Sequence, residues 1–328
     1  MSTSASDTPY WLGIDLGGTK ILAEVYDADW NLKGDKKRKT KAERGQKAGL
    51  ERMLKTARQA IEAAGIAPEH LGGIGIGCPG VVDAKKGVLV RAPNLGWDNV
   101  KMRKLLQDEF NVPVAVANDV DAGTYGEATR GAGKGGRVVF GVFPGTGIGA
   151  GLVHEDRIYT GSRLSCLELG HLQVVPDGPR CGCGRRGCLE AVAGRLAISS
   201  AVSAAVLRGQ APWLREHVGS DPAAIRSSAL ADAVDKGDDV VRDILEQAFD
   251  ALGSVLGGMV NLLGPDVMVI GGGLAEAMPD LLHASIQRAM EPKIMRPLQG
   301  SCDLRIAKLG DHATTLGAAA WVRHEVEA

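Results

Sequence analysis

Two segments of the chain share one plan: an apolar strand, a turn made mostly of small residues, and a second apolar strand. The first reads IDLGGTKILAEVYD from Ile14, and the second reads VVFGVFPGTGIGAGLVH from Val138. A plan that recurs within one chain is typical of a repeated structural unit. The pattern predicts two related α/β lobes, each opening with a β-hairpin whose glycine-rich tip offers backbone N–H groups to an anion.

Segments of helix and strand length alternate along the rest of the chain. Apolar residues at helical spacing predict a helix over residues 46–64. A mostly apolar run predicts a second helix over residues 239–263, and a run rich in small residues predicts a third over residues 313–322. Short apolar runs predict buried strands over residues 112–117 and directly before Gly271. Strands that alternate with helices are typical of parallel or mixed sheets covered by helices, so we expect an α/β fold.

Composition argues against several classes of partner. The chain has 38 Lys and Arg residues against 39 Asp and Glu residues, so we expect no nucleic-acid partner. No apolar run reaches the roughly 18 residues that cross a membrane, and the polar start MSTSASDTP lacks the apolar segment of a signal peptide. We therefore expect a cytoplasmic protein, where clustered cysteines bind metal more often than they form disulfides.

Three of the six cysteines lie close together in the segment CGCGRRGC. His171 precedes them, which completes the pattern H-x9-C-x-C-x4-C, and a tetrahedral zinc site needs four nitrogen or sulfur ligands. Intervening glycines allow the chain to curl around one ion. The spacing predicts a structural Zn²⁺ site, with free thiols or a disulfide as the alternatives. Its ligands would be His171, Cys181, Cys183 and Cys188.

Glycine-rich turns at three strand ends are candidate nucleotide-binding loops. Bare backbone at such turns lets phosphate oxygens approach closely. Asp15 could hold a hydrated Mg²⁺ next to the phosphates, or it could simply cap the first hairpin. The candidate ATP- and Mg²⁺-binding residues are Asp15, Gly17, Gly18, Thr19, Lys20, Gly145, Thr146, Gly147, Gly271, Gly272 and Gly273.

Phosphoryl transfer also needs a group that accepts the proton of the attacking nucleophile. Asp119 is the candidate catalytic base because it follows a predicted strand, at the edge where functional groups of open α/β sheets gather. The alternative is that Asp119 only caps the next helix, since Asp and Asn both favour that position. Asp121 is the local competitor for the catalytic position.

Taken together, these residues resemble the ROK family of sugar kinases and repressors over about residues 11–322. The most specific segment, ELGH-x9-CGC-x4-CLE, is similar to the family's zinc and sugar signature, while IDLGGTK, PGTGIGAG and the pair Asn118–Asp119 resemble its two phosphate loops and catalytic pair. Within the family, VVPDGPRCGCG and RAPNLGW are most similar to bacterial ATP-dependent glucokinases. The chain departs from the family pattern at Cys166 and at Pro144.

The resemblance implies an actin-like ATPase (ribonuclease H-like) fold with two similar lobes and the active site in the cleft between them. The implied lobes are residues 10–118 plus 313–328, and residues 119–312. It also implies ATP-dependent phosphorylation of a hexose, in which Asp119 takes the proton of the 6-hydroxyl group, and assembly as a homodimer. The implied sugar-binding residues are Gly80, Asn94, Asn118, Glu168, His171 and Glu190.

Alternatives to a glucokinase remain at this point. An N-acetylhexosamine, mannose or fructose kinase would use the same motifs, and polyphosphate could replace ATP as the donor. A sugar-responsive transcriptional regulator is the alternative from another class. Family repressors carry a DNA-binding winged helix before the first phosphate loop, whereas only 14 residues precede Asp15, too few for a helix-turn-helix domain. Asp119 also favours a catalytic function.

Overall fold

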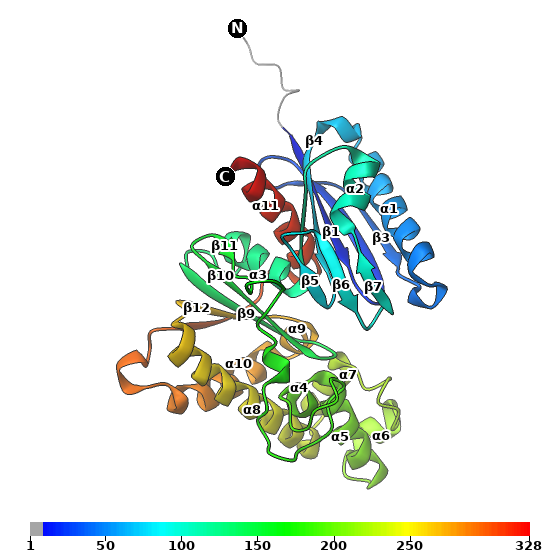
Figure 1. The fold of residues 1–328 in the computed structure, drawn as a ribbon. Coiled ribbons are helices and arrows are strands. Elements are labelled where there is room, and N and C mark those ends of the chain that lie inside the picture. Colours follow the sequence, from blue (N-terminus) through cyan, green and yellow to red (C-terminus); the bar gives the residue numbers. More distant parts are fainter. Residues whose placement is uncertain (1–8) are drawn as a thin grey trace. The chain divides into compact units, whose positions relative to one another are not determined.

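The computed structural model describes residues 9–328, and most of the polar start, where no signal peptide is predicted, lies outside the described residues. The described chain forms two compact units (Figure 1). Unit 1 contains the described chain up to Gly135, together with Gly151–Cys166 and Asp311–Ala328, and unit 2 contains Gly136–Ala150 and Leu167–Gly310. No helix between residues 9 and 328 has the length and apolar character of a membrane span.

Unit 1 is built on a five-stranded mixed sheet. Its strands β1, β4 and β8 are parallel, and β2 and β3 add an antiparallel meander at one side. In spatial order the strands are β3 (Leu32–Lys39), β2 (Lys20–Tyr26), β1 (Tyr10–Leu16), β4 (Leu71–Cys78) and β8 (Val114–Asn118). The helices of this unit are α1 (Gln46–Ala63), α2 (Met102–Phe110), α3 (Asp119–Arg130) and α11 (Ala313–Glu327).

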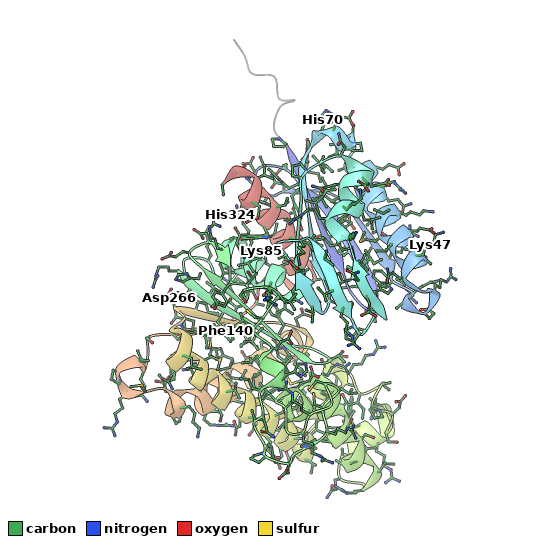
Figure 2. The ribbon with its side chains drawn as sticks, viewed as in Figure 1. Lys47, His70, Lys85, Phe140, Asp266 and His324 are labelled. Atoms are coloured by element: carbon green, nitrogen blue, oxygen red, sulfur yellow. The ribbon has the colours of Figure 1, made fainter. Side chains whose placement is uncertain are left out.

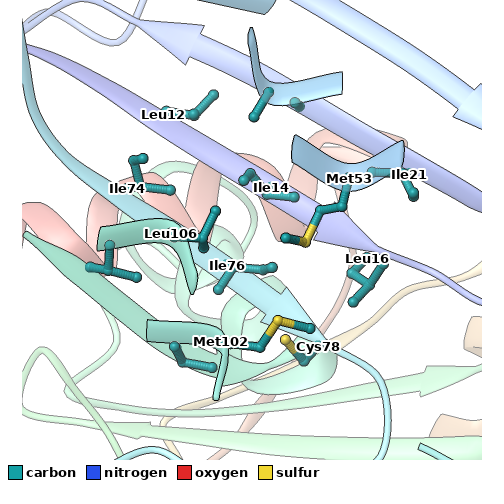
Figure 3. Close-up of a cluster of buried hydrophobic side chains, with 14 of the residues drawn as sticks. Leu12, Ile14, Leu16, Ile21, Met53, Ile74, Ile76, Cys78, Met102 and Leu106 are labelled. Carbon is teal, nitrogen blue, oxygen red and sulfur yellow. The ribbon is translucent and has the colours of Figure 1, made fainter. Parts of the chain in front are cut away.

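An apolar core lies between one face of this sheet and helices α1 and α2 (Figure 3). Leu12 and Ile14 of β1 lie in it with Met53 of α1 and Met102 of α2, and all four are fully buried. Because successive side chains of a strand point to opposite faces, the residue between Leu12 and Ile14 faces the other side. That residue is Gly13, and helix α11 lies against it.

A three-stranded antiparallel sheet also belongs to unit 1. It consists of β5 (Val81–Asp83), β6 (Val88–Ala92) and β7 (Trp97–Val100), and its buried residues belong to the same core. The turn that leads into β5 and the turn that links β6 to β7 carry Gly80 and Asn94, two of the predicted sugar-binding residues.

The second five-stranded sheet has the same strand order as the first. Its strands in spatial order are β11 (Arg157–Ile158), β10 (Ile148–His154), β9 (Val138–Pro144), β12 (Val267–Ile270) and β13 (Asp303–Ile306). Strands β9, β12 and β13 are parallel, as β1, β4 and β8 are. The side chain of Asp266, labelled in Figure 2, accepts hydrogen bonds from the backbone of Arg137 and Val138 at 2.8 and 2.7 Å, which ties β9 to β12.

Seven helices of unit 2 accompany this sheet. They are α4 (Glu190–Ala193), α5 (Arg195–Leu207), α6 (Pro212–His217), α7 (Ser227–Asp235), α8 (Asp239–Leu263), α9 (Gly273–Ala277) and α10 (Pro279–Met290). Helix α8 has the predicted bounds, and α11 extends five residues beyond its predicted end at residue 322. The repeated strand order confirms the predicted α/β fold of two mixed sheets.

The compact units divide the chain differently from the predicted lobes, whose boundary falls between Asn118 and Asp119. Helix α3 begins at Asp119 but belongs to unit 1. The reason is its packing on α11, where a Cβ atom at Gly126 would lie 2.4 Å from the carbonyl oxygen of Ala313. Only a glycine allows the two backbones to approach so closely.

Candidate functional site

The turn between β1 and β2 is the predicted first phosphate loop. The Gly17 N–H group donates to the Lys20 carbonyl oxygen at 2.9 Å, which closes the turn. Thr40, a fully buried residue after β3, donates its hydroxyl to the Gly17 carbonyl at 2.7 Å and its backbone N–H to Thr19 at 2.9 Å. Thr40 therefore stabilises the loop through two hydrogen bonds, and no local sequence motif predicts this contribution.

Lys20 already has a carboxylate partner in this loop. Its Nζ atom lies 2.5 Å from Oδ1 of Asp311, and Nζ of Lys37 lies 3.1 Å from Oδ2 of the same residue. The hydrogen bond from Lys20 is the main reason that the pKa of Asp311 lies below its ordinary value. A phosphate at this loop would therefore compete with Asp311 for Lys20.

Asp15 and the segment that carries Asp119 lie at the same edge of the first sheet. Asp15 pairs with Gly77 of β4, and Gly77 pairs with Ala117 of β8, two residues before Asp119. A Cβ atom at Gly77 would lie only 3.2 Å from the Cα atom of Asp119, so the glycine makes room for the start of α3. Burial, and next the negative charge of Asp119, raise the pKa of Asp15 to about 7.

Asn118 is the N-cap of α3. Its Oδ1 atom accepts hydrogen bonds from the backbone N–H groups of Val120 at 2.8 Å and Asp121 at 3.3 Å. The N-cap alternative for Asp119 is thus wrong, because Asp119 is the first helical residue. The Nδ2 atom of Asn118 donates to the Gly80 carbonyl at 2.9 Å, which joins two of the predicted sugar-binding residues.

The Gly80 turn requires glycine. Its φ of 85° lies in the left-handed region, and a Cβ atom there would lie 2.3 Å from the Arg91 carbonyl oxygen. Asn94 lies beside the first phosphate loop, with its Cβ atom 3.6 Å from the position of a Cβ atom on Gly18. Unit 1 therefore carries one cluster of predicted site residues: Asp15, Gly17, Gly18, Thr19, Lys20, Gly80, Asn94, Asn118 and Asp119.

Unit 2 holds a cluster of one histidine and three cysteines. The ligand atoms of His171, Cys181, Cys183 and Cys188 all lie within 4.8 Å of one another. Nδ1 of His171 is 3.6 Å from Sγ of Cys181, and the Sγ atoms of Cys183 and Cys188 are 3.7 Å apart. Ligands about 2.3 Å from a tetrahedral Zn²⁺ ion are separated by about 3.8 Å, so this donor set fits the ion.

The backbone around the cluster fits a metal site, and the environments of its thiols differ from one another. Gly184 and Gly187 have φ values of 92° and 71°, and a Cβ atom at Gly187 would overlap the Val175 carbonyl. No disulfide joins any of the cysteines in the described part of the chain, so the alternative Cys181–Cys188 disulfide is not formed. Hydrogen bonding to the backbone of Arg185, followed by its side chain, lowers the pKa of Cys183, whereas burial raises that of Cys181.

The predicted second phosphate loop, Gly145–Gly147, joins β9 to β10 in unit 2. The Gly145 N–H group donates to the Gly147 carbonyl at 2.8 Å, which closes the loop. Oε2 of Glu190 lies 3.3 Å from the Ile148 backbone nitrogen, and Oε1 lies 3.7 Å from Sγ of Cys181. Glu190, predicted to bind sugar, thus links the metal-ligand cluster to this loop.

The Gly271–Gly273 turn lies next to the end of β9. Strands β9 and β12 are parallel neighbours, so their carboxyl ends meet at one edge of the sheet. A Cβ atom at Gly272 would lie 3.0 Å from the Pro144 carbonyl, and one at Gly271 would lie 2.6 Å from the Phe143 ring. The backbone of Pro144, which departs from the family pattern, therefore lies beside this turn.

Glu168 and His171 flank a single helical turn in unit 2. The His171 N–H group donates to the Glu168 carbonyl at 3.0 Å, and the Glu168 side chain is exposed. Unit 2 therefore carries the second cluster of predicted residues, which the local sequence motifs located: Gly145, Thr146, Gly147, Glu168, His171, Cys181, Cys183, Cys188, Glu190, Gly271, Gly272 and Gly273.

Comparison with known proteins identifies relatives over the whole described fold. The sequence profile of the ROK family matches residues 11–325. The chain is 30% identical to the glucokinase of Thermotoga maritima over 316 residues, which is 96% of this chain and 98% of that protein. Many further relatives of the same kind exist among characterised proteins, and some are repressors.

Two solved structures have the same fold. A ROK family glucokinase from Streptomyces griseus, in complex with glucose and AMPPNP, superposes with a TM-score of 0.83 at 28% identity, covering 96% of this chain and 99% of that chain. A ROK family transcriptional regulator, homologous to the Escherichia coli MLC protein, superposes with a TM-score of 0.87 at 25% identity, covering 98% of this chain and 79% of that chain.

Proposed function

The chain belongs to the ROK family, and from that premise we propose that it is a sugar kinase that transfers the γ-phosphoryl group of ATP to the 6-hydroxyl group of a hexose. The family contains both kinases and regulators, so membership alone does not select the activity. The choice of a kinase over a regulator rests on the acidic edge of the first sheet, which is the edge that carries Asp15 and Asp119.

The observation that carries the proposal is the common edge shared by Asp15 and Asp119. Strand register aligns Asp15 with Gly77 and Ala117, and the charge of Asp119 raises the pKa of Asp15. Phosphoryl transfer needs one carboxylate near the metal ion and another that accepts the proton of the nucleophile. Because Asn118 caps α3, Asp119 is not required as the cap.

In the proposed reaction the oxygen of the sugar hydroxyl forms a bond to the γ-phosphorus atom. The bond between that phosphorus and the bridging oxygen of ADP breaks, and Asp119 accepts the hydroxyl proton. Asp15 would hold the hydrated Mg²⁺ that accompanies ATP, and the glycine turns would hold the nucleotide with those backbone N–H groups that do not already donate to a carbonyl oxygen of the protein. The residues proposed for the nucleotide are Gly17, Gly18, Thr19, Lys20, Gly145, Thr146, Gly147, Gly271, Gly272 and Gly273.

We assign the cluster in unit 2 to a structural Zn²⁺ ion held by four protein ligands. Such a site leaves no position for substrate, so its contribution is to fix the segment that carries Glu168 and Glu190. Those two glutamates and His171 of unit 2 are proposed to bind sugar hydroxyl groups, and so are Gly80, Asn94 and Asn118 of unit 1. Hydrogen bonds to individual hydroxyl groups are the means by which such a site distinguishes one sugar from another.

Glucose is the proposed sugar. Support comes from the glucokinase of Thermotoga maritima and from the Streptomyces griseus enzyme, whose structure contains glucose and AMPPNP. We further propose that the protein acts in the cytoplasm, where ATP is available, and that it is a homodimer.

The test is a measurement of ADP release with Mg-ATP and a panel of glucose, mannose, fructose, N-acetylglucosamine and N-acetylmannosamine. We expect turnover with glucose to exceed that with the others. Asp119→Asn should lower turnover about a hundredfold or more, because the proton acceptor is lost, while sugar affinity measured by calorimetry persists. Asp98→Asn, which changes an exposed acid of β7, is the matched control.

Near-normal turnover in Asp119→Asn would remove Asp119 as the base. Turnover with another sugar of the panel would retain the mechanism and change the substrate. Sugar binding without ADP release, in a protein with full metal content, would instead favour the regulator class, to which the superposed ROK transcriptional regulator belongs.

A further inference from the structure

Arg195, the first residue of α5, lies against the Gly145–Gly147 loop. Its backbone N–H group donates to the Gly145 carbonyl at 3.0 Å, and its Nη2 atom donates to the Thr146 hydroxyl at 3.2 Å. The two contacts place a guanidinium group at the loop that is proposed to hold phosphate. No sequence motif of the loop includes this residue.

The two glycines of the loop have different surroundings. A Cβ atom at Gly147 would lie 2.1 Å from Oε2 of Glu190, so that side is occupied by a side chain. A Cβ atom at Gly145 would have no neighbour within 4 Å. Of the two loop glycines, Gly145 is therefore the one with open space beside it, and Arg195 contacts both Gly145 and its neighbour Thr146.

The hydrogen-bonding groups at this position suit an anion. The Thr146 oxygen accepts from Arg195, so the hydroxyl proton is available to donate to a ligand. A guanidinium group has five N–H donors, and only one is used on Thr146. Among the residues that the structure describes, Arg195 forms no ion pair. A cation without a carboxylate partner beside a glycine turn is well placed to bind a phosphate.

We propose that Arg195 binds a terminal phosphate of the nucleoside triphosphate held at the Gly145–Gly147 loop. The proposal rests on the proposed function, because that function supplies the nucleotide. Arginine suits this task because its planar guanidinium group can donate two parallel hydrogen bonds to one phosphate, which lysine cannot do.

The test compares binding of Mg-AMPPNP and of adenosine by calorimetry. Arg195→Gln should weaken Mg-AMPPNP binding about ten- to a hundredfold, the usual effect of losing charge-assisted hydrogen bonds, and should leave adenosine binding unchanged. Arg195→Lys should give an intermediate affinity, because it keeps the charge and loses the paired donors. Arg208→Gln, at the other end of α5 and exposed, should bind like the wild type.

Two results would overturn the proposal. One is an Arg195→Gln variant that binds Mg-AMPPNP as the wild type does. The other is an equal loss of Mg-AMPPNP and adenosine affinity, which would mean that Arg195 only supports the loop. Thermal unfolding and metal content show whether Arg195→Gln is folded. If it is not, Arg195→Lys is tested in its place. An Mg-AMPPNP affinity of Arg195→Lys that equals the wild-type affinity, with the same salt dependence, would then overturn the proposal.

The outcomes also separate this proposal from the proposed function. A wild-type protein that phosphorylates no sugar, yet binds Mg-AMPPNP in an Arg195-dependent manner, would remove the kinase activity and leave the phosphate site. A protein that phosphorylates sugar, but whose affinity for Mg-AMPPNP does not change in Arg195→Gln, would retain the kinase activity and remove the phosphate site at Arg195. A wild-type protein that binds no Mg-AMPPNP would contradict both.

Discussion

Individual side chains in unit 1 are tied together by contacts between distant parts of the chain. Glu24 of β2 is only 1% exposed, and its carboxylate accepts hydrogen bonds from the Tyr26 hydroxyl at 2.6 Å and from the Thr315 hydroxyl. His312 lies 2.6 Å from the same carboxylate. A buried carboxylate needs such partners, because burial without hydrogen bonds disfavours the charged form. Burial, followed by the charge of Glu24, raises the pKa of Tyr26 above its ordinary range.

Asp15 makes folding pH-dependent in a direction opposite to that of a salt-bridged carboxylate. Burial and the charge of Asp119 raise its pKa from 3.8 to about 7, so the folded protein binds a proton that the unfolded chain has lost. The contribution of Asp15 to stability therefore falls as the pH rises from about 4 to about 7, by at most about 4 kcal/mol. Above about pH 7 the folded protein bears the full free-energy cost of burying the ionised Asp15 carboxylate.

Asp15→Asn removes this titration. The variant should gain stability over the wild type, and the gain should be larger at pH 8 than at pH 5 in urea unfolding without Mg²⁺. Asp119→Asn removes one of the charges that raise the pKa, so it should move the same transition to lower pH. A difference between Asp15→Asn and wild type that is equal at pH 5 and pH 8 would contradict the assignment.

At the scale of elements, glycines set how closely the helices approach the sheets. Helix α11 lies on β1 and β4, where Cβ atoms at Gly13 and Gly75 would each lie 1.8 Å from a carbonyl oxygen of the helix. Side chains of ordinary size at these positions would move α11 away from the sheet. Since the N-terminal turn of α11 follows Asp311, the partner of Lys20, the glycines also position the first phosphate loop.

Gly75→Ala should destabilise the protein by about 3 kcal/mol or more, because the added methyl group overlaps the Ala318 carbonyl rather than a movable side chain. Gly258→Ala is the matched control. Gly258 lies inside helix α8 with no atom within 4 Å of an added Cβ, so this change should stabilise the protein by up to about 1 kcal/mol. Urea unfolding measures both variants, and equal effects would contradict the close approach of α11.

At the scale of the whole molecule, the predicted site residues divide between the two units. Unit 1 carries the acidic edge and the first phosphate loop, and unit 2 carries the metal-ligand cluster and the other two glycine turns. The cluster supports the second loop through Glu190 and through the start of α5. Loss of the metal should therefore destabilise the local structure of unit 2 before that of unit 1.

Removal of the metal by a chelator should increase hydrogen exchange in residues 171–195 and around the Gly145–Gly147 loop, because the ligands then no longer hold that segment. Amides of the unit 1 core should keep their protection. Cys183→Ser should have the same effect and lower the zinc content measured by mass spectrometry. Cys166→Ser, which changes a thiol outside the cluster, should retain the metal. Uniform loss of protection in both units would contradict a local structural function.

The sequence by itself determined those features that depend on residues near one another in the chain. The spacing of His171 and the cysteines defined the metal-ligand cluster, and the patterns of apolar and small residues located α1, α8 and α11. The repeated strand–turn–strand pattern predicted two sheets of one plan, because periodicity and turn chemistry act over a few residues.

Only the tertiary structure decided which residues support these motifs. Three contacts join segments that no local pattern connects. They are the hydrogen bond from Thr40 to the first phosphate loop, the ion pair between Asp311 and Lys20, and the hydrogen bond from Arg195 to Thr146. The choice between Asn118 and Asp119 as the N-cap was also decided there. The physical reason is that such contacts arise when separate elements pack, and packing depends on the shape of the whole unit rather than on the sequence around either partner.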